Sequence, residues 1–235
     1  MFAGPRALVF DFDGIIVDSE PLHLAAFQRT LATVGITLTA EEYWTHYLGF
    51  DDHDAIAHAL TTAHGGAPPA DVARLMHAKA EHFLALVEHG VSVFPGVREL
   101  VRGAAARVPL AIASGALGSE IELILRAVGL RDAFRTIVSA NDVQHGKPDP
   151  EAYVAALAHL RADVAPELVA AECLAVEDSP AGIAAARAAG MRCVAVTNSC
   201  PARDLAAAGA DLVVASLEGV GWERLAGLFG EATPR

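Results

Sequence analysis

The chain contains little cysteine, little lysine and no long apolar run. Its three cysteines, Cys173, Cys193 and Cys200, are unevenly spaced in 235 residues, which excludes a disulfide framework or a cysteine-rich zinc site and predicts reduced thiols. No apolar stretch reaches the roughly 18 residues of a membrane span, and the N-terminus lacks the charged start and long apolar stretch of a signal peptide. We therefore expect a cytoplasmic protein.

Basic residues are also scarce relative to acidic ones. The chain has 17 Lys and Arg against 29 Asp and Glu, a net charge of −12. Nucleic acids and anionic membranes both require a basic face, so this balance speaks against either as a partner. No obligate protein partner is evident in the pattern. A small ligand remains, and if it is anionic, a few local groups must hold it.

Among the basic residues, lysine is the rarer type by far. Only Lys79 and Lys147 occur, and Lys147 stands in the loop-like segment Gly146-Lys147-Pro148-Asp149-Pro150. A lysine offers a compact point charge that arginine does not. Its presence in a chain so biased to arginine indicates a specific need for an ammonium group, although chance also explains a lone lysine.

Two aspartates follow the first apolar segment. Leu8-Val9-Phe10 is too short for a helix and suits a buried strand, and it is followed by Asp11, Asp13 and Gly14. Alternate residues of an extended segment face the same side, so both carboxylates can line one crevice while Phe12 points into the protein. For this segment taken alone, a strand that ends in a simple Asp-Gly turn is the alternative.

The remaining patterns divide the chain into a helical insert and a sheet. Apolar residues recur at helical spacing from about 21 to 34, and residues 40 to 90 continue without a convincing strand. Short apolar runs then alternate with helices, as in βαβ units. We predict an α/β fold: a doubly wound, Rossmann-like parallel sheet in residues 1–18 and 92–235, with a smaller all-helical cap domain in residues 19–91. The later strands are expected at 109–113, 136–139, 173–176, 193–197 and 211–215.

Polar groups gather at the predicted carboxyl ends of these strands, where an open parallel sheet binds its ligands. Carboxylates from two strands form a hard oxygen site that suits Mg²⁺. A hydroxyl, backbone N–H groups and a lysine suit a phosphate. With these cations nearby, Asp11 can stay ionised and attack phosphorus to form an aspartyl phosphate, while Asp13 transfers the proton. The groups concerned are Asp11, Asp13, Ser114, Gly115, Lys147, Glu177 and Asp178.

Four ordered motifs make the chain resemble the haloacid dehalogenase-like hydrolase superfamily over essentially its whole length. More narrowly, it resembles the branch of β-phosphoglucomutase and phosphoglycolate phosphatase, which carries a small helical cap. The motifs are Asp11-Phe12-Asp13-Gly14, Ser114-Gly115, Gly146-Lys147-Pro148 and Glu177-Asp178-Ser179.

The resemblance implies a role for each matching residue. Asp11 is then the nucleophile, Asp13 the general acid and base, and the Ser114-Gly115 turn and Lys147 bind the phosphoryl group. Mg²⁺ would be held by Asp11, the backbone carbonyl of Asp13, and Asp178, with Glu177 as a further or water-mediated ligand. We accordingly expect a Mg²⁺-dependent phosphatase acting on a small phosphorylated metabolite, such as a phosphosugar.

The sequence departs from the mutase pattern at the residues that grip a second phosphate. Basic cap residues of the mutase appear here as Leu48 and Asp52, and Ala116-Leu117-Gly118 replaces its polar and basic group after the serine. These changes favour a phosphatase, and a mutase is the alternative. A receiver-type signalling domain or a non-catalytic phospho-ligand binding module is a further alternative, against which Asp13 and the cap argue. His23 matches a cap-hinge histidine of the mutase, or lies on a helix surface.

Overall fold

The structure, a computed structural model, describes residues 4–47, 50, 52–66 and 68–230. It forms two compact units, one of Met1–Asp18 with Ser92–Arg235 and the other of Ser19–Val91. Among the helices of the described residues, none is both long enough and apolar enough to cross a lipid bilayer.

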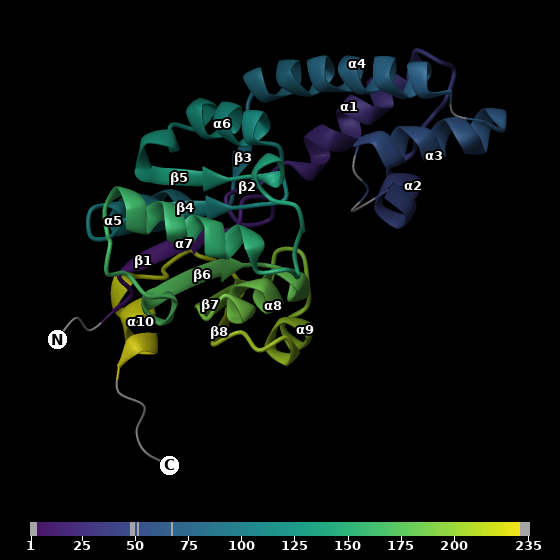
Figure 1. Ribbon diagram of the computed structural model, residues 1–235. Helices are drawn as coiled ribbons and strands as arrows, with labels where there is room; N and C mark the ends of the chain where they lie inside the picture. Colours follow the sequence, from purple (N-terminus) through teal and green to yellow (C-terminus); the bar gives the residue numbers. More distant parts are fainter. Residues whose placement is uncertain (1–3, 48–49, 51, 67, 231–235) are drawn as a thin grey trace. The chain divides into compact units, whose positions relative to one another are not determined.

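A six-stranded parallel sheet forms the centre of the first unit (Figure 1). The strand order is β5-β4-β1-β6-β7-β8, and every neighbouring pair is parallel. The chain therefore runs outward from β1 in both directions, which makes β1 the switch point of a doubly wound sheet and confirms the predicted fold class. The strands are β1 (Ala7–Phe10), β4 (Leu110–Ala113), β5 (Phe134–Val138), β6 (Cys173–Glu177), β7 (Arg192–Val196) and β8 (Leu212–Val214).

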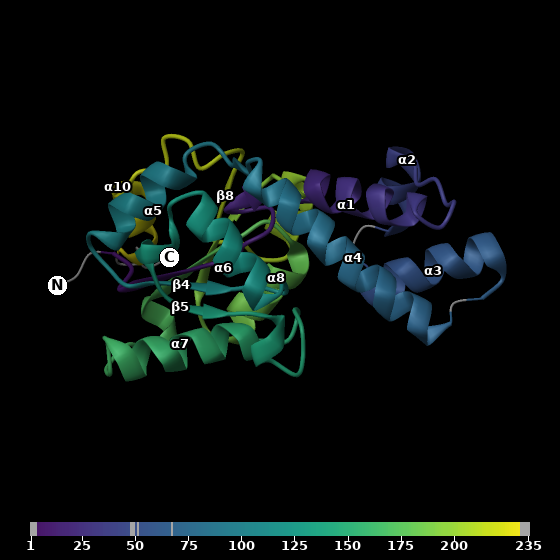
Figure 2. The same cartoon turned by 90° about the horizontal axis from the view of Figure 1, so that it is seen from above.

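Helices cover both faces of this sheet. In Figure 2, α7 lies on one side of β4 and β5, and α5 lies on the other. The face toward α7, α8 and α9 is built largely from small side chains such as Ala7, Ala111 and Cys193, which pack with Tyr153 and Ile183 of the helices. Small residues let these helices approach the sheet closely. The helices are α5 (Val97–Ala105), α6 (Gly118–Ala127), α7 (Glu151–Asp163), α8 (Pro180–Ala188), α9 (Ala202–Ala207) and α10 (Trp222–Ala226).

The chain leaves and re-enters this unit through a pair of very short strands. β2 (Val17–Asp18) and β3 (Ser92–Val93) pair antiparallel, with Val17 opposite Val93 and Asp18 opposite Ser92. The two segments at the predicted domain boundaries are thus tied to each other by backbone hydrogen bonds. Two-residue strands are too short to produce a sequence pattern, so only the boundaries were predictable.

The secondary-structure elements described in the second unit are all helical, as predicted for the insert. Its core includes Phe27, Leu31, Ile56 and Leu75, contributed by helices that lie far apart in sequence. Thr39 and Glu42 form a capping box that starts α2. The elements are α1 (Glu20–Ala32), α2 (Ala40–Glu42), a π-helical turn (Tyr43–Tyr47), α3 (Asp52–His64) and α4 (Pro69–Glu88).

Candidate active site

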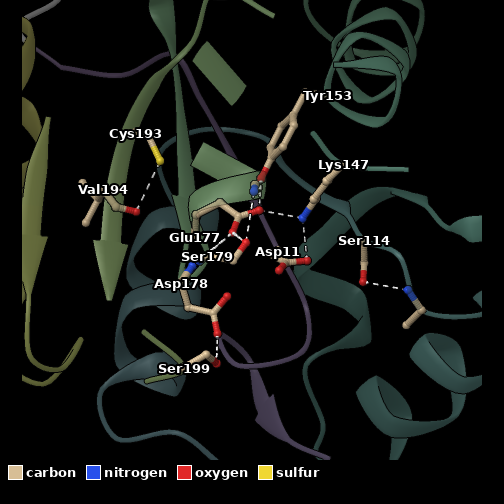
Figure 3. Close-up of polar contacts among 12 residues, drawn as sticks. Asp11, Ser114, Lys147, Tyr153, Glu177, Asp178, Ser179, Cys193, Val194 and Ser199 are labelled. Carbon is tan, nitrogen blue, oxygen red and sulfur yellow. Dashed lines mark hydrogen bonds and ion pairs between the residues drawn. The ribbon is translucent and has the colours of Figure 1, made fainter. Parts of the chain in front are cut away.

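The ammonium group of Lys147 lies between two carboxylates at the carboxyl edge of the sheet (Figure 3). Its Nζ is 2.8 Å from Asp11 Oδ1 and 2.6 Å from Glu177 Oε1. Asp11 directly follows β1, and Glu177 ends the adjacent β6, whose Val176 pairs with Phe10. The parallel register therefore places the two carboxylates side by side, and the loop before α7 delivers the lysine.

Glu177 is fully buried, and hydrogen-bond donors surround its carboxylate. Oε1 accepts from Lys147 Nζ and from the Tyr153 hydroxyl at 2.8 Å. Oε2 accepts from the backbone N–H groups of Asp178 and Ser179 and from the Ser179 hydroxyl. A carboxylate offers about four lone-pair positions, so these donors leave no position for a metal ion. Glu177 therefore fixes Lys147 in place.

Asp178 points its carboxylate toward the loop that carries Asp11. Its side chain is nearly buried, with 4% exposed, and Oδ2 accepts a hydrogen bond from the Ser199 hydroxyl. A Cβ atom on Gly14 would lie only 1.8 Å from Asp178 Oδ2, and Gly14 has φ 75°. Both facts require glycine at position 14. Asp13 precedes it, and the nearby Asp13 charge helps raise the pKa of Asp178.

The charge balance of this cluster fits a divalent cation. Carboxylate oxygens of Asp11, Glu177 and Asp178 lie within 4.8 Å of one another. When all three carboxylates are ionised, the single ammonium of Lys147 leaves two negative charges uncompensated. Hard oxygen donors are the ligands that Mg²⁺ prefers. Because hydrogen bonds occupy Glu177, Asp11 and Asp178 are the side chains able to hold the ion.

Ser114 and Gly115 stand at the end of β4, next to β1. Ile112 of β4 pairs with Phe10 of β1, so Ser114, which follows β4, lies next to Asp11, which follows β1. Ser114 is buried, and its Oγ accepts a hydrogen bond from the Ala116 N–H at 3.1 Å. The hydroxyl proton then remains to be donated, as a phosphate oxygen requires. A Cβ on Gly115 would meet nothing within 4 Å, so space alone does not require this glycine.

A family model described as haloacid dehalogenase-like hydrolase matches residues 8–196. The chain belongs to the haloacid dehalogenase-like hydrolase family.

Several characterised relatives and a crystal structure resemble this hydrolase. Protein CbbY of Rhodobacter capsulatus is 34% identical over 196 residues, covering 80% of this chain and 84% of CbbY. Fructose-1-phosphate phosphatase YqaB of Escherichia coli is 31% identical over 204 residues, covering 83% and 98%. β-Phosphoglucomutase of Bacillus subtilis is 31% identical over 216 residues, covering 89% and 88%. The crystal structure of CbbY from Rhodobacter sphaeroides in complex with phosphate has a TM-score of 0.78 at 30% identity, covering 94% and 99%. The predicted family and phosphatase class are confirmed.

Burial and mutual repulsion perturb the acid–base behaviour of the hydrolase site. Burial raises the pKa of Asp11 to about 8, and the charges of Glu177 and Asp178 add to this effect, although Lys147 opposes it. Burial also raises the pKa of Asp178 to about 6. Burial by itself lowers the pKa of Lys147, but the Asp11 and Glu177 carboxylates outweigh it and raise this pKa above its ordinary value, so the lysine stays charged. One ammonium does not compensate three carboxylates, so we expect Asp11 to hold a proton at neutral pH until a cation joins the cluster.

This protonation predicts how stability depends on pH without metal. Folded Asp11 has a raised pKa, so between about pH 4 and 8 the folded state binds more protons than the unfolded state, and the free energy of unfolding falls as pH rises. His23 acts oppositely below about pH 6.5, because burial and the Lys79 charge lower its pKa to about 3. The Asp11 contribution therefore exceeds the opposing His23 contribution between pH 6.5 and 8.

Thermal unfolding in EDTA should accordingly show a melting temperature that decreases from pH 6.5 to 8. Added Mg²⁺ should reduce this decrease, because it favours ionised Asp11. An Asp11→Asn variant has no carboxyl proton to lose at position 11, so its melting temperature should change less between pH 6.5 and 8. A melting temperature that rises over this interval in EDTA, to the same extent in both proteins, would contradict the assigned protonation.

Gly182, in the first turn of α8, provides the space that Glu177 occupies. A Cβ at this position would lie 1.8 Å from Glu177 Oε1 and 2.1 Å from Oε2. We expect Gly182→Ala to displace the Glu177 carboxylate, release Lys147 and lower turnover by more than tenfold. Gly103→Ala in α5 is the control, because a Cβ there meets nothing within 4 Å and should stabilise the helix by about 0.5–1 kcal/mol. Steady-state kinetics and thermal unfolding of both variants test this; equal turnover would contradict it.

The other predicted residues lie in the helical unit. His23 is half-buried, stacks on Phe83 with ring centroids 4.3 Å apart, and has its Nδ1 3.0 Å from Lys79 Nζ. Lys79 is fully buried and pairs with Asp52 at 2.7 Å. The helix-surface alternative for His23 was therefore wrong, because the side chain packs within its own unit. Leu48, which with Asp52 replaces basic cap residues of the mutase, lies outside the described residues.

Sequence reasoning missed three polar residues at this site. Tyr153 was not anticipated because it lies on a helix rather than at a strand end. Asn198 and Ser199 follow β7, so the rule that ligands bind at the carboxyl ends of strands would have found them.

Proposed function

We propose that this hydrolase is a Mg²⁺-dependent phosphatase that acts on a small phosphorylated metabolite, such as a phosphosugar, through an aspartyl phosphate on Asp11. The observation that carries the proposal is the contact of Asp11 Oδ1 with Lys147 Nζ at 2.8 Å, at the carboxyl end of the central strand. The cation beside this carboxylate is the Lys147 ammonium, and its positive charge can bind the negatively charged phosphoryl group. The name of one relative, fructose-1-phosphate phosphatase YqaB, supports the same chemistry.

Each residue of the cluster has a role in this reaction. Asp11 attacks phosphorus as the bond to the leaving oxygen breaks, and Asp13 protonates that oxygen. Asp13 then takes a proton from the water that hydrolyses the aspartyl phosphate. Lys147 and the Ser114 hydroxyl bind the non-bridging phosphoryl oxygens, with the Gly115 backbone beside them. Glu177 holds Lys147 in position.

The proposed metal ligands are Asp11, Asp178 and the backbone carbonyl of Asp13. When bound, Mg²⁺ supplies positive charge that offsets the repulsion between the Asp11 carboxylate and the phosphoryl oxygens. The chemistry of the donors and the two uncompensated negative charges support this choice of ion. We further assign the helical unit, residues 19–91, as the cap that excludes bulk water during the reaction.

The pairing of the helical unit's single lysine favours a phosphatase over a mutase. A mutase must hold a bisphosphate intermediate, which requires a cation for the second phosphate. The unit contains Arg29, Arg74 and one lysine, Lys79, and the ammonium of Lys79 is buried and compensated by Asp52. Position 52 thus contributes a negative charge and also neutralises the nearest lysine.

Incubation with a hexose 1-phosphate and Mg²⁺ distinguishes these two activities. A phosphatase releases inorganic phosphate in proportion to the substrate consumed, whereas a mutase accumulates the 6-phosphate isomer with little free phosphate. The same assay over phosphorylated sugars, polyols, short acids and nucleotides identifies the substrate class, with EDTA as the metal-free control. Absence of turnover over this panel with Mg²⁺ present would overturn the proposal.

A further inference from the structure

The loop after β7 reaches the active site, although the proposed reaction gives none of its residues a role. β7 pairs with β6, with Val176 opposite Val194 and Glu177 opposite Ala195. The carboxyl ends of these strands are therefore neighbours. Residues 197–201, between β7 and α9, begin beside the carboxylates that end β6.

Two side chains of this loop hold two different segments of the site. The Ser199 hydroxyl donates a hydrogen bond to Asp178 Oδ2, in the segment after β6. The Asn198 side-chain amide donates to the backbone carbonyl of Gly14 at 2.6 Å, in the segment after β1. These segments lie 164 positions apart in the numbering from Gly14 to Asp178, and one short loop contacts both.

The packing around Gly14 provides a separate observation. A Cβ at Gly14 would lie 1.8 Å from Asp178 Oδ2 and 2.9 Å from Ser199 Oγ. The glycine backbone, the carboxylate and the hydroxyl are therefore in close contact with one another. A displacement of Ser199 leaves space into which the Asp178 carboxylate can rotate.

We infer that Asn198 and Ser199 are positioning residues, which orient Asp178 and the Asp13-Gly14 backbone for metal binding. In Figure 3, the Asp178 oxygen bonded to Ser199 points away from Asp11, and the other oxygen points toward it. A hydrogen bond to Oδ2 thus directs Oδ1 to the cation. Asn198 similarly fixes the peptide that follows the Asp13 carbonyl. The inference rests on the proposed function, because it concerns the ion assigned there.

Residues that orient metal ligands typically change metal affinity by about 10–100-fold when removed. We expect Ser199→Ala to weaken Mg²⁺ binding by about this factor. Asn198→Ala should weaken it less, by about three- to tenfold, as expected for the loss of one hydrogen bond to a backbone carbonyl. Ser199→Thr keeps a hydroxyl and should retain near-normal affinity. Ser216→Ala is the matched control, because the Ser216 hydroxyl accepts from the Glu218 N–H in a different loop.

The experiment is a calorimetric titration of the EDTA-treated, dialysed 235-residue protein and its variants with Mg²⁺ alone. Turnover of an aryl phosphate then gives a second readout: Ser199→Ala should need more Mg²⁺ for half-maximal rate, while the rate at saturating Mg²⁺ stays within a few-fold of wild type. Melting temperatures in EDTA report folding, and if Ser199→Ala does not fold, Asn198→Ala and Ser199→Thr carry the test.

The outcomes separate this inference from the proposed function. Weakened Mg²⁺ binding in Ser199→Ala and Asn198→Ala, with Ser199→Thr and Ser216→Ala near wild type, supports the positioning role. Wild-type Mg²⁺ affinity in Ser199→Ala or, where that variant does not fold, in Asn198→Ala overturns it and leaves the proposed phosphatase intact. Failure of the wild-type protein to bind Mg²⁺ overturns both.

Discussion

Replacing Asp11 with asparagine is expected to abolish phosphate release, lowering kcat by about 10⁴-fold or more, the scale on which removal of a hydrolase nucleophile acts. Asparagine has nearly the same shape, and its amide oxygen can still accept from Lys147 at the position where Asp11 Oδ1 lies 2.8 Å from Nζ. The amide does not attack phosphorus, so the change removes the nucleophile with little change in packing. The variant should therefore fold normally, and single-turnover phosphate release measures the loss.

Asp13→Asn is the informative comparison for this prediction. It leaves Asp11 able to attack but removes the group that protonates the leaving oxygen and deprotonates water, a loss of about 10²–10⁴-fold. With a substrate whose leaving group needs no protonation, such as an aryl phosphate, the second step should become limiting. Mass spectrometry after acid quenching should then detect phosphorylated Asp11 in Asp13→Asn and none in Asp11→Asn. Retained turnover in Asp11→Asn would exclude Asp11 as the nucleophile.

The sheet and much of the site were predictable because one rule governs both. The strands β1, β4 and β6 are short, fully buried runs, and each leads into a polar residue that is out of place in a core: Asp11, Ser114 or Glu177. In a parallel sheet these ends meet at one edge, so listing them already brings together groups that lie far apart in sequence. The strand register then shows which strand ends are neighbours, which the spacing of motifs in the sequence does not contain. Phe10 pairs with both Ile112 and Val176.

The functional assignment of Glu177 depended on contacts that no sequence pattern contains. From the motif alone, Glu177 was a possible metal ligand. The structure surrounds its carboxylate with donors from Lys147, Tyr153 and Ser179, which leaves it as the anchor of the lysine. The Tyr153 hydroxyl reaches Glu177 only because α7 packs on the sheet at one particular rotation. That hydrogen bonds occupy the acceptor positions of a carboxylate can be recognised only from the three-dimensional structure.

Removal of the Lys147 charge should damage both stability and catalysis. Lys147→Met keeps the apolar stem but leaves Asp11 and the fully buried Glu177 without their shared cation. Breaking a buried ion pair by removing one partner typically costs about 3–5 kcal/mol. We expect a decrease of this order in the free energy of unfolding in EDTA at pH 8, measured by denaturant titration, together with loss of detectable phosphatase activity.

Two further variants distinguish the charge of Lys147 from its shape. Lys147→Arg keeps a positive charge, but a planar guanidinium does not fit the point between Asp11 Oδ1 and Glu177 Oε1, so it should retain more stability than methionine while remaining nearly inactive. In Lys147→Met/Glu177→Gln, the buried glutamate charge is absent. If uncompensated charge causes the destabilisation, this double variant should be more stable than Lys147→Met alone, giving a non-additive cycle. Additive losses would instead assign the cost to packing, and in either case activity should stay absent, because the phosphoryl group has lost its lysine.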